Sequence, residues 1–329
     1  MSNIKIQVDA QGSSNTGTLG FTVVYVGTSV VTGFQVALSS MQFDGFIDYV
    51  NKPSPNWVSS IGSQSQQIDF AALDFSGVGS GSAAGGLKLG QLSLSGWNYL
   101  TQPSLVNFSL ITKDNKTISL KDPSMSYDIV VNGNVGLNLA NYSGANSFQG
   151  GNGIDTVTFT GLKSEYGINL SNGFPLDVKG SNTSAHLTSI ERLAFKDVSV
   201  AYDLSSNAGT TAKLIGAIFG ANSIKNQQYV GIGLHLLDTG ISTDDLVSLA
   251  INFKLGAGFS KESLVNLLYS NVLNSSPNSN DLKYWVTELS NGHQSPVSLT
   301  ELAMDLSFNT DNINLTGLKL SGIDFQLTT

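Results

Sequence analysis

The chain has 329 residues, a formal net charge of −8 and only 12% charged residues, with 35 glycines and no cysteine. An apolar fraction of 40% is ordinary for a folded chain, so intrinsic disorder is excluded and the length allows two or three domains with buried cores. Lys and Arg form no cluster, which argues against nucleic acid or an anionic membrane surface as a partner, and without cysteine there are no disulfides or thiol nucleophiles.

The first part of the chain, residues 1–131, alternates apolar and polar residues over short runs. Such alternation is typical of strands with one buried face, and clusters of Gly, Ser, Asn and Pro separate the runs as turns do. The clearest runs are Ile4–Val8, Phe21–Tyr25, Phe34–Leu38, Leu87–Leu94 and Val106–Leu110. We therefore predict an antiparallel β-sandwich here. The order of the runs resembles the cohesin-like sandwiches of bacterial surface and scaffold proteins.

Residues 132–204 remain β-rich and contain one small pattern twice, nine residues apart, at Gly144–Phe148 and Gly153–Val157. Gly-rich turns followed by short strands at this interval form a parallel β-roll, in which stacked turns hold Ca²⁺. Glycine permits left-handed backbone angles that point carbonyls inward, and Ca²⁺ takes about six to eight oxygen ligands from carbonyls and carboxylates. The predicted calcium ligands are Asn146, Gly150, Asn152, Gly153 and Asp155.

The nine residues from Gly150 to Thr158, GGNGIDTVT, match the nonapeptide GGxGxDxUx at every defined position and resemble RTX proteins. The segment from Ile190 to Asp203 resembles a block of large secreted RTX proteins that leads into a helical domain. The resemblance implies a calcium-binding bacterial protein that is exported unfolded by the type I pathway, with its export signal at the C-terminal end. The preceding copy is degraded, with Asn146 at the place of Asp155. Two interpretations stay open: a working calcium site, or a Gly-rich turn that caps a β-element without metal.

From residue 205 to 329 the apolar residues follow a helical period. The helical runs are Ala212–Phe219, Leu246–Phe253, Leu264–Leu273 and Leu282–Leu289. Helix starts are expected at Ser242 and Ser260, and a helix stop at Gly292. The tail Leu318–Leu327 alternates again and predicts a final strand.

Part of this helical region resembles a domain of unknown function that commonly closes RTX-like chains. The residues that match its pattern are Leu268–Leu273, Pro277, Leu282–Trp285, Leu289 and Gly292. We expect the aromatic residues Tyr269, Tyr284 and Trp285 to pack in the core of a helix pair. The chain as a whole is thus predicted to be an α+β multidomain protein: an antiparallel β-sandwich in 1–131, a short β-roll-like region in 132–204, and a helical C-terminal domain with a terminal strand in 205–329.

The sequence contains no recognisable catalytic pattern. His186, His235 and His293 lie far apart without the spacing of metal ligands, and His235 is expected to be an ordinary helix residue. No GxSxG nucleophile motif occurs in a strand-turn-helix context. We therefore predict that the protein is not an enzyme.

These features predict an extracellular structural or adhesive protein of a bacterial surface or matrix, similar to surface-layer proteins. It would assemble with itself or attach to a cell-surface component, ordered by Ca²⁺. The start of the chain, MSNIKIQVDAQG, has no apolar run, so export without a cleaved N-terminal signal peptide is expected, and no membrane span is predicted. The alternative is a carbohydrate- or protein-binding module, in which Trp57, Trp97 and Tyr99 of the sandwich grip a glycan unless they are buried at its end.

Overall fold

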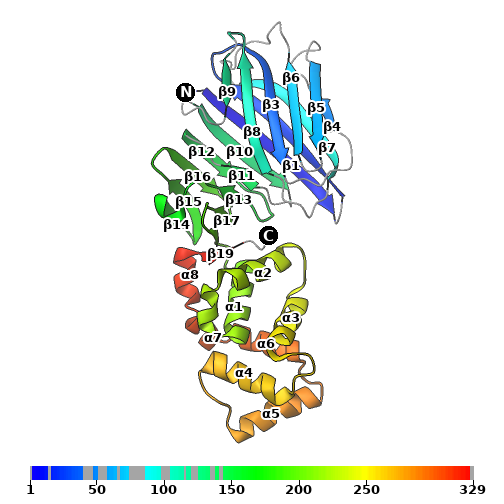
Figure 1. Ribbon diagram of the computed structural model, residues 1–329, viewed down its shortest axis with the longest axis vertical. Helices are drawn as coiled ribbons and strands as arrows, with labels where there is room; N and C mark the ends of the chain where they lie inside the picture. The colour runs from blue at the N-terminus through cyan, green and yellow to red at the C-terminus, as the bar shows by residue number, and fades with distance from the viewer. Residues whose placement is uncertain are drawn as a thin grey trace. The chain divides into compact units, whose positions relative to one another are not determined.

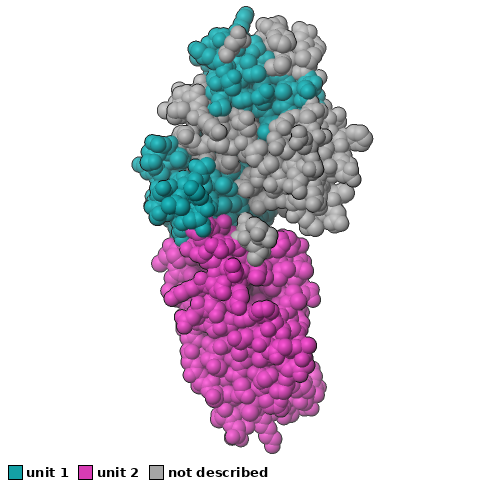
Figure 2. Space-filling model, viewed as in Figure 1, with its two compact units in different colours: residues 1–197 teal, residues 198–329 magenta. Residues whose placement is uncertain are grey.

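The structure of the chain is a computed structural model, which describes residues 2–13, 16–39, 47–50, 58–64, 67–73, 86–97, 104–114, 116–119, 125–133, 138–140 and 144–326. The chain forms two compact units, which divide between Asp197 and Val198 (Figure 2). The first unit is built from strands and the second mainly from helices, so the predicted α+β multidomain class is confirmed.

Two sheets build the first unit (Figure 1). The first sheet has, in spatial order, β14 (Gly167–Ser171), β15 (Phe174–Lys179), β16 (Thr183–Thr188), β12 (Gly144–Gln149), β10 (Met125–Gly133), β1 (Ser2–Ser13), β2 (Thr16–Val26), β7 (Leu87–Trp97) and β4 (Ile47–Val50). The second has β17 (Arg192–Ala194), β13 (Thr156–Thr158), β11 (Asn138–Ala140), β8 (Ser104–Thr112), β3 (Val31–Ser39), β6 (Gln67–Leu73) and β5 (Val58–Gln64), with β9 (Thr117–Ser119) paired to β8.

The N-terminal strands form the predicted sandwich with antiparallel neighbours, as in β1–β2, β2–β7, β3–β8 and β3–β6. In β1 the alternation places Ile4, Ile6 and Val8 in the core, while Lys5 and Gln7 are exposed. Because successive side chains of a strand point to opposite faces, this period-two pattern alone determines which face is buried.

Beyond the sandwich the chain runs in parallel coils that alternate between the two sheets (Figure 1). Each coil contributes one strand to each sheet, β10 then β11, β12 then β13, and β16 then β17, and pairs with its neighbours in parallel. The buried residues that the register aligns are Ile129, Phe148 and Leu187 in the first sheet and Leu139, Val157 and Leu193 in the second. This is the β-roll-like arrangement that the repeat predicts.

The sandwich and the coils share both sheets. β1 pairs with β10 and β8 pairs with β11, both in parallel. Residues 131 and 132, where the sequence analysis separates sandwich from β-roll, are neighbours within β10. The coils therefore extend the two layers of the sandwich, and the β14–β15 hairpin is inserted between the second and third coil.

The second unit contains β18 (Ser199–Ala201), α1 (Asn207–Phe219), α2 (Gln227–Asp238), α3 (Thr243–Leu255), α4 (Lys261–Leu273), α5 (Ser279–Ser290), α6 (Pro296–Asp305), α7 (Ser307–Asn312), α8 (Leu315–Ser321) and β19 (Ile323–Phe325). Helix α1 is buried along most of its length and contributes to two apolar clusters, one with α3–α6 and one with α2, β18 and β19. The predicted caps are confirmed, since the side chains of Ser242 and Ser260 accept hydrogen bonds from Asp245 N–H and Ser263 N–H. No helix among the described residues is both long enough and apolar enough to cross a membrane.

The strand predicted for the alternating tail, Leu318–Leu327, is wrong over most of its length. Leu318 and Leu320 belong to helix α8, and the final strand β19 covers only Ile323–Phe325. The Asn314 side chain caps α8 by accepting a hydrogen bond from Gly317 N–H, and Gly322, with φ +72°, ends it. These cap contacts outweigh the short alternation, because a few alternating residues fit a helix turn as well as a strand.

The packing of β19 against α2 leads to a first testable prediction. A Cβ on Gly231 would lie 1.8 Å from the Gln326 carbonyl oxygen, and Gln326 N–H donates to Gln227 O at 3.1 Å. Gly231→Ala is therefore expected to lower the free energy of unfolding by about 3 kcal/mol, although alanine favours a helix. Chemical unfolding checks this against Gln228→Ala, an exposed position of the same helix. Equal stability of the two variants would contradict the close packing.

Candidate functional site

The Gly-rich turn joins β12 in the first sheet to β13 in the second. Gly150 is buried, and its N–H donates to Thr188 O at 2.9 Å in the next coil. A Cβ on Gly150 would lie 1.9 Å from Ser189 O and 2.6 Å from Asp155 Oδ2. None of Gly150, Gly151 and Gly153 has a positive φ, so the expectation of left-handed angles is wrong for this turn. At Gly150, glycine is required because neighbouring backbone lies too close for a side chain.

The Asp155 side chain lies inside the turn and holds it by hydrogen bonds. Its side chain is fully buried, and Oδ2 accepts a hydrogen bond from Gly151 N–H at 2.8 Å. Its own N–H donates to Glu191 Oε2 at 2.9 Å, and its carbonyl accepts from Glu191 N–H at 3.2 Å and Arg192 N–H at 3.0 Å. Asp155 therefore connects its own turn to the corresponding turn of the next coil.

Two further charged residues, Glu191 and Arg192, lie where the Asp155 turn meets the next coil. Arg192 is 2% exposed, and its Nη1 donates to Glu191 O at 3.4 Å. Burial, followed by the nearby Asp155 charge, raises the pKa of the Glu191 carboxyl to about 7, against the lowering effect of the Asp155 N–H bond and of Arg192. The nonapeptide pattern identifies Asp155 but not Glu191, because it ends before the coil that supplies Glu191.

The pKa of Glu191 leads to a second prediction. A carboxyl whose pKa is about 7 when folded and near 4.5 when unfolded makes the folded state bind more protons between these pH values. The free energy of unfolding should therefore fall as pH rises through this window, by about 3 kcal/mol. Glu191→Gln keeps an oxygen acceptor for Asp155 N–H and should remove this part of the pH dependence.

The measurement is chemical unfolding of wild type and Glu191→Gln at several pH values between 5 and 8. Glu262→Gln, an exposed carboxylate of α4, is the matched control and should retain the wild-type slope. Parallel stability curves for wild type and Glu191→Gln would show that this carboxyl does not titrate in the window.

The five predicted calcium ligands lie around this turn with different surroundings. Asn146 is buried on β12 between Tyr127 of β10 and Ala185 of β16, whereas Asn152 is exposed. Both carboxylates at the turn, Asp155 and Glu191, accept a hydrogen bond from a backbone N–H, which occupies part of their acceptor capacity. In the part of the chain that the structure describes, no group of three or more His, Cys, Asp or Glu side chains is arranged to hold a metal. Calcium binding here stays a prediction.

The structure does not test the prediction that three aromatic residues of the sandwich bind a glycan. Trp57 and Tyr99 lie outside the described residues, and Trp97 is the last residue of β7, where only the backbone is described. Glycan binding by the sandwich stays a prediction.

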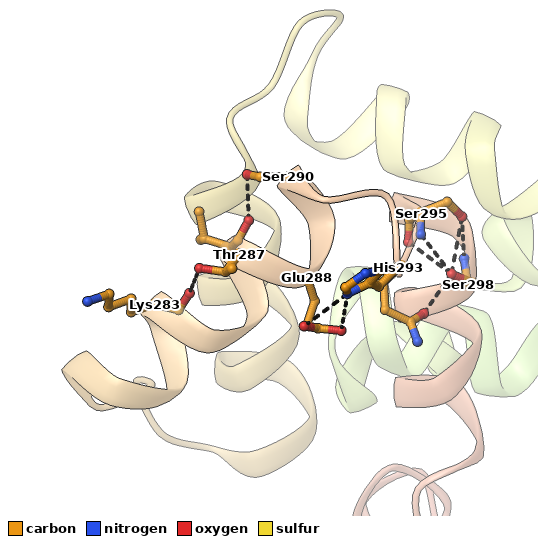
Figure 3. A network of polar contacts seen from close by, with 9 residues as sticks. Lys283, Thr287, Glu288, Ser290, His293, Ser295 and Ser298 are labelled. Carbon is orange, nitrogen blue, oxygen red and sulfur yellow. Dashed lines mark hydrogen bonds and ion pairs between the residues drawn. The ribbon is translucent and has the colours of Figure 1, made fainter.

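The histidines do not form a site together. His186 on β16 is exposed, with Nδ1 2.9 Å from Asp177 Oδ1 on β15, and His235 is an exposed residue of α2. His293 lies after α5, with Nδ1 3.3 Å from Glu288 Oε2 (Figure 3).

The connection from α5 to α6 is held by a local polar network (Figure 3). The Glu288 carbonyl accepts hydrogen bonds from His293 N–H at 3.1 Å and Gln294 N–H at 3.3 Å. Ser295 caps α6 by accepting from Ser298 N–H, and Ser298 Oγ accepts from Ser295 N–H in return. These hydrogen bonds satisfy backbone groups at the end of α5 and at the start of α6, so the network has a structural role.

The aromatic residues of the helical pattern differ in burial. Tyr269 and Trp285 pack against the core as expected. Tyr284 is 56% exposed and packs edge-on against Trp285, with ring centroids 5.0 Å apart, so its expected core position is wrong. In a helix, adjacent residues point in directions about 100° apart, so Tyr284 and Trp285 do not share one buried face.

Comparison with known proteins finds similarity in both units. Residues 246–307, from α3 to the first residue of α7, match a family described as a domain of unknown function, DUF4214, and the pattern at 268–292 lies within this match. No curated relative matches the chain.

Several solved structures are similar in part. An uncharacterised protein from Nocardia farcinica with an immunoglobulin-like fold shows 13% identity over 36% of this chain and 86% of its own, with a TM-score of 0.25. A non-cellulosomal cohesin from Archaeoglobus fulgidus shows 10% identity over 39% and 86%, with a TM-score of 0.23. The type II cohesin A11 from Bacteroides cellulosolvens shows 13% identity over 38% and 95%, with a TM-score of 0.26. At these values the similarity concerns the sandwich fold only, and the architecture rests on the strand pairings described above.

Proposed function

We propose that this chain is an extracellular structural or adhesive protein of a bacterial surface or matrix, with a role like that of surface-layer proteins. It acts without catalysis, by non-covalent association with itself or with a cell-surface component. The proposal includes export by the type I pathway and, as the sequence of the turn suggests, ordering by Ca²⁺.

The observation that carries the proposal is the continuity of the two sheets. The successive coils bury one row of apolar side chains from each sheet, and the two sheets are hydrogen-bonded continuously from β4 to β14 and from β5 to β17. Repetitive stacking of this kind suits a spacer, since each coil is stabilised by its neighbours. The outward residues of the last coil, Ser184, His186 and Thr188, are polar and exposed. Like the sequence as a whole, this part of the surface is polar without being rich in charged residues.

The test is the particle size of the purified full chain, measured by light scattering and electron microscopy in EGTA and then in millimolar Ca²⁺. We expect growth into large particles or sheets when Ca²⁺ is added. Species no larger than a dimer under both conditions would overturn surface assembly, and the predicted binding module would then be the better hypothesis.

A further inference from the structure

The dipeptide Asn-Gly occurs four times in the chain, at residues 132–133, 152–153, 172–173 and 291–292. In this dipeptide the backbone nitrogen of the glycine can attack the side-chain amide carbon of the asparagine, because glycine has no Cβ that hinders the approach. Ring closure requires the asparagine backbone to rotate away from both the helical and the extended conformation. A fold that fixes either conformation therefore slows the reaction, and the four pairs differ in how firmly the fold holds them.

Three of the pairs belong to regular structure. Asn132–Gly133 ends β10, where both residues pair with β1. Asn172 and Gly173 form the two-residue turn between β14 and β15, and both have positive φ, +52° and +84°. Asn291 caps the end of α5 with φ −84° and ψ −4°, and its N–H donates to Thr287 O. In each case the flanking strands or helix fix the backbone of the pair.

The fourth pair, Asn152–Gly153, lies in the Gly-rich turn, outside any helix or strand. The turn is anchored on either side of the pair, because Gly151 N–H donates to Asp155 Oδ2 at 2.8 Å and Asp155 is fully buried. Between these anchors Asn152 is exposed and has a glycine on both sides. Since glycine permits the widest range of backbone angles, this tip reaches the geometry for ring closure without opening a strand pair or a helical turn.

We propose that Asn152 is a site of spontaneous deamidation in the folded protein. The Gly153 nitrogen forms a bond to Asn152 Cγ, the Cγ–Nδ2 bond breaks, and ammonia leaves with the Gly153 amide proton, which gives a succinimide. Water then opens the ring. Cleavage between Gly153 N and Cγ gives aspartate, whereas cleavage between Gly153 N and the main-chain carbonyl carbon of residue 152 gives isoaspartate. The reaction consumes one water, releases one ammonia and needs no oxidant or reductant.

The product changes the charge and the length of the turn. It adds one negative charge to the formal −8 of the chain, in the same turn as Asp155. One of the five predicted calcium ligands thereby changes from a neutral amide to a carboxylate, a ligand type that Ca²⁺ favours. In isoaspartate the main chain also runs through Cβ, which lengthens the connection from β12 to β13 by one atom. The full chain should therefore occur in two charge forms whose ratio changes with time.

The first test measures deamidation of each pair in the full chain by peptide mass spectrometry, in EGTA at pH 8, with the chain folded and unfolded in guanidinium chloride. In the unfolded chain the four pairs should react at similar rates, because they share the reacting dipeptide. In the folded chain Asn152 should keep its rate within about threefold, whereas the other three should slow at least about tenfold, because each must first open its local structure. An isoaspartyl methyltransferase should label the folded protein in the peptide that contains residue 152.

The second test follows the charge of the folded protein by isoelectric focusing. Wild type should gain a form with one more negative charge during incubation, and Asn152→Ser should not. Asn291→Ser is the matched control, since Asn291 is also exposed and followed by glycine; it should gain the acidic form at the wild-type rate. Far-UV circular dichroism confirms that both variants fold.

Two results would overturn the assignment of Asn152. One is a folded chain in which Asn152 is slowed as strongly as Asn172 and Asn291. The other is an acidic form that appears as fast in Asn152→Ser as in wild type. The modification needs neither Ca²⁺ nor association, so both tests are independent of the surface assembly proposed above.

Discussion

Replacing Gly150 with alanine is expected to lower the free energy of unfolding of the β unit by about 4 kcal/mol. The added Cβ would lie 1.9 Å from Ser189 O, a backbone atom of the next coil. Backbone cannot give way there without breaking the bond between Gly150 N–H and Thr188 O, which is 2.9 Å long. The added Cβ should therefore weaken the packing between the two coils.

Chemical unfolding followed by circular dichroism, with hydrogen exchange of residues 144–158, measures this loss. Gly167→Ala in β14 is the matched control, because the nearest atom to its Cβ would be Lys179 O at 3.9 Å. The control should stay within about 0.5 kcal/mol of wild type. Equal behaviour of the two variants would mean that the coils separate more easily than the hydrogen bonds between them indicate.

Substitution of Asp155 has the second large effect, and it depends on the new side chain. Asp155→Ala leaves the Gly151 N–H without its 2.8 Å acceptor inside the fold and should lower the unfolding free energy by about 3 kcal/mol. Asp155→Asn retains an oxygen for Gly151 N–H and removes the charge that disfavours ionised Glu191. We therefore expect the asparagine variant to lose only about 1 kcal/mol.

Unfolding of both variants in EGTA and in millimolar Ca²⁺ separates the hydrogen bond from the predicted metal site. In EGTA the alanine variant should be clearly less stable than the asparagine variant. If Asp155 also binds Ca²⁺, added calcium should raise the unfolding midpoint of wild type and should have little effect on either variant. Equal losses for alanine and asparagine in EGTA would contradict the structural role of the carboxylate oxygen.

Only part of the candidate turn could be predicted from the sequence. The nonapeptide pattern located Gly150 and Asp155 correctly, because their spacing is local. Glu191 lies 36 residues beyond Asp155, after the β14–β15 hairpin, and no pattern connects the two. Its shifted pKa results from burial between coils, which depends on how the third coil packs on the second.

The uncovered apolar side of α3 was likewise not predictable, although the helix itself was. The helical period in Leu246–Phe253 indicates an apolar face on α3, but it does not show which part of that face is covered. The structure buries Leu246 and Ala250 and leaves Leu249 and Phe253 exposed, because the neighbouring helices cover only one side of the stripe.

The sequence by itself determined most of the secondary structure and its buried faces: the alternating strands of the sandwich, the coil formed around GGNGID, and the helices with caps at Ser242 and Ser260. These follow from the spacing of residues within one segment, which sets the direction of each side chain. The tertiary structure alone decided that Gly150 is required by a neighbouring backbone, that Asp155 and Glu191 share one contact, and that α3 leaves an apolar stripe uncovered. Each of these depends on the distance between segments far apart in the chain, which local periodicity does not contain.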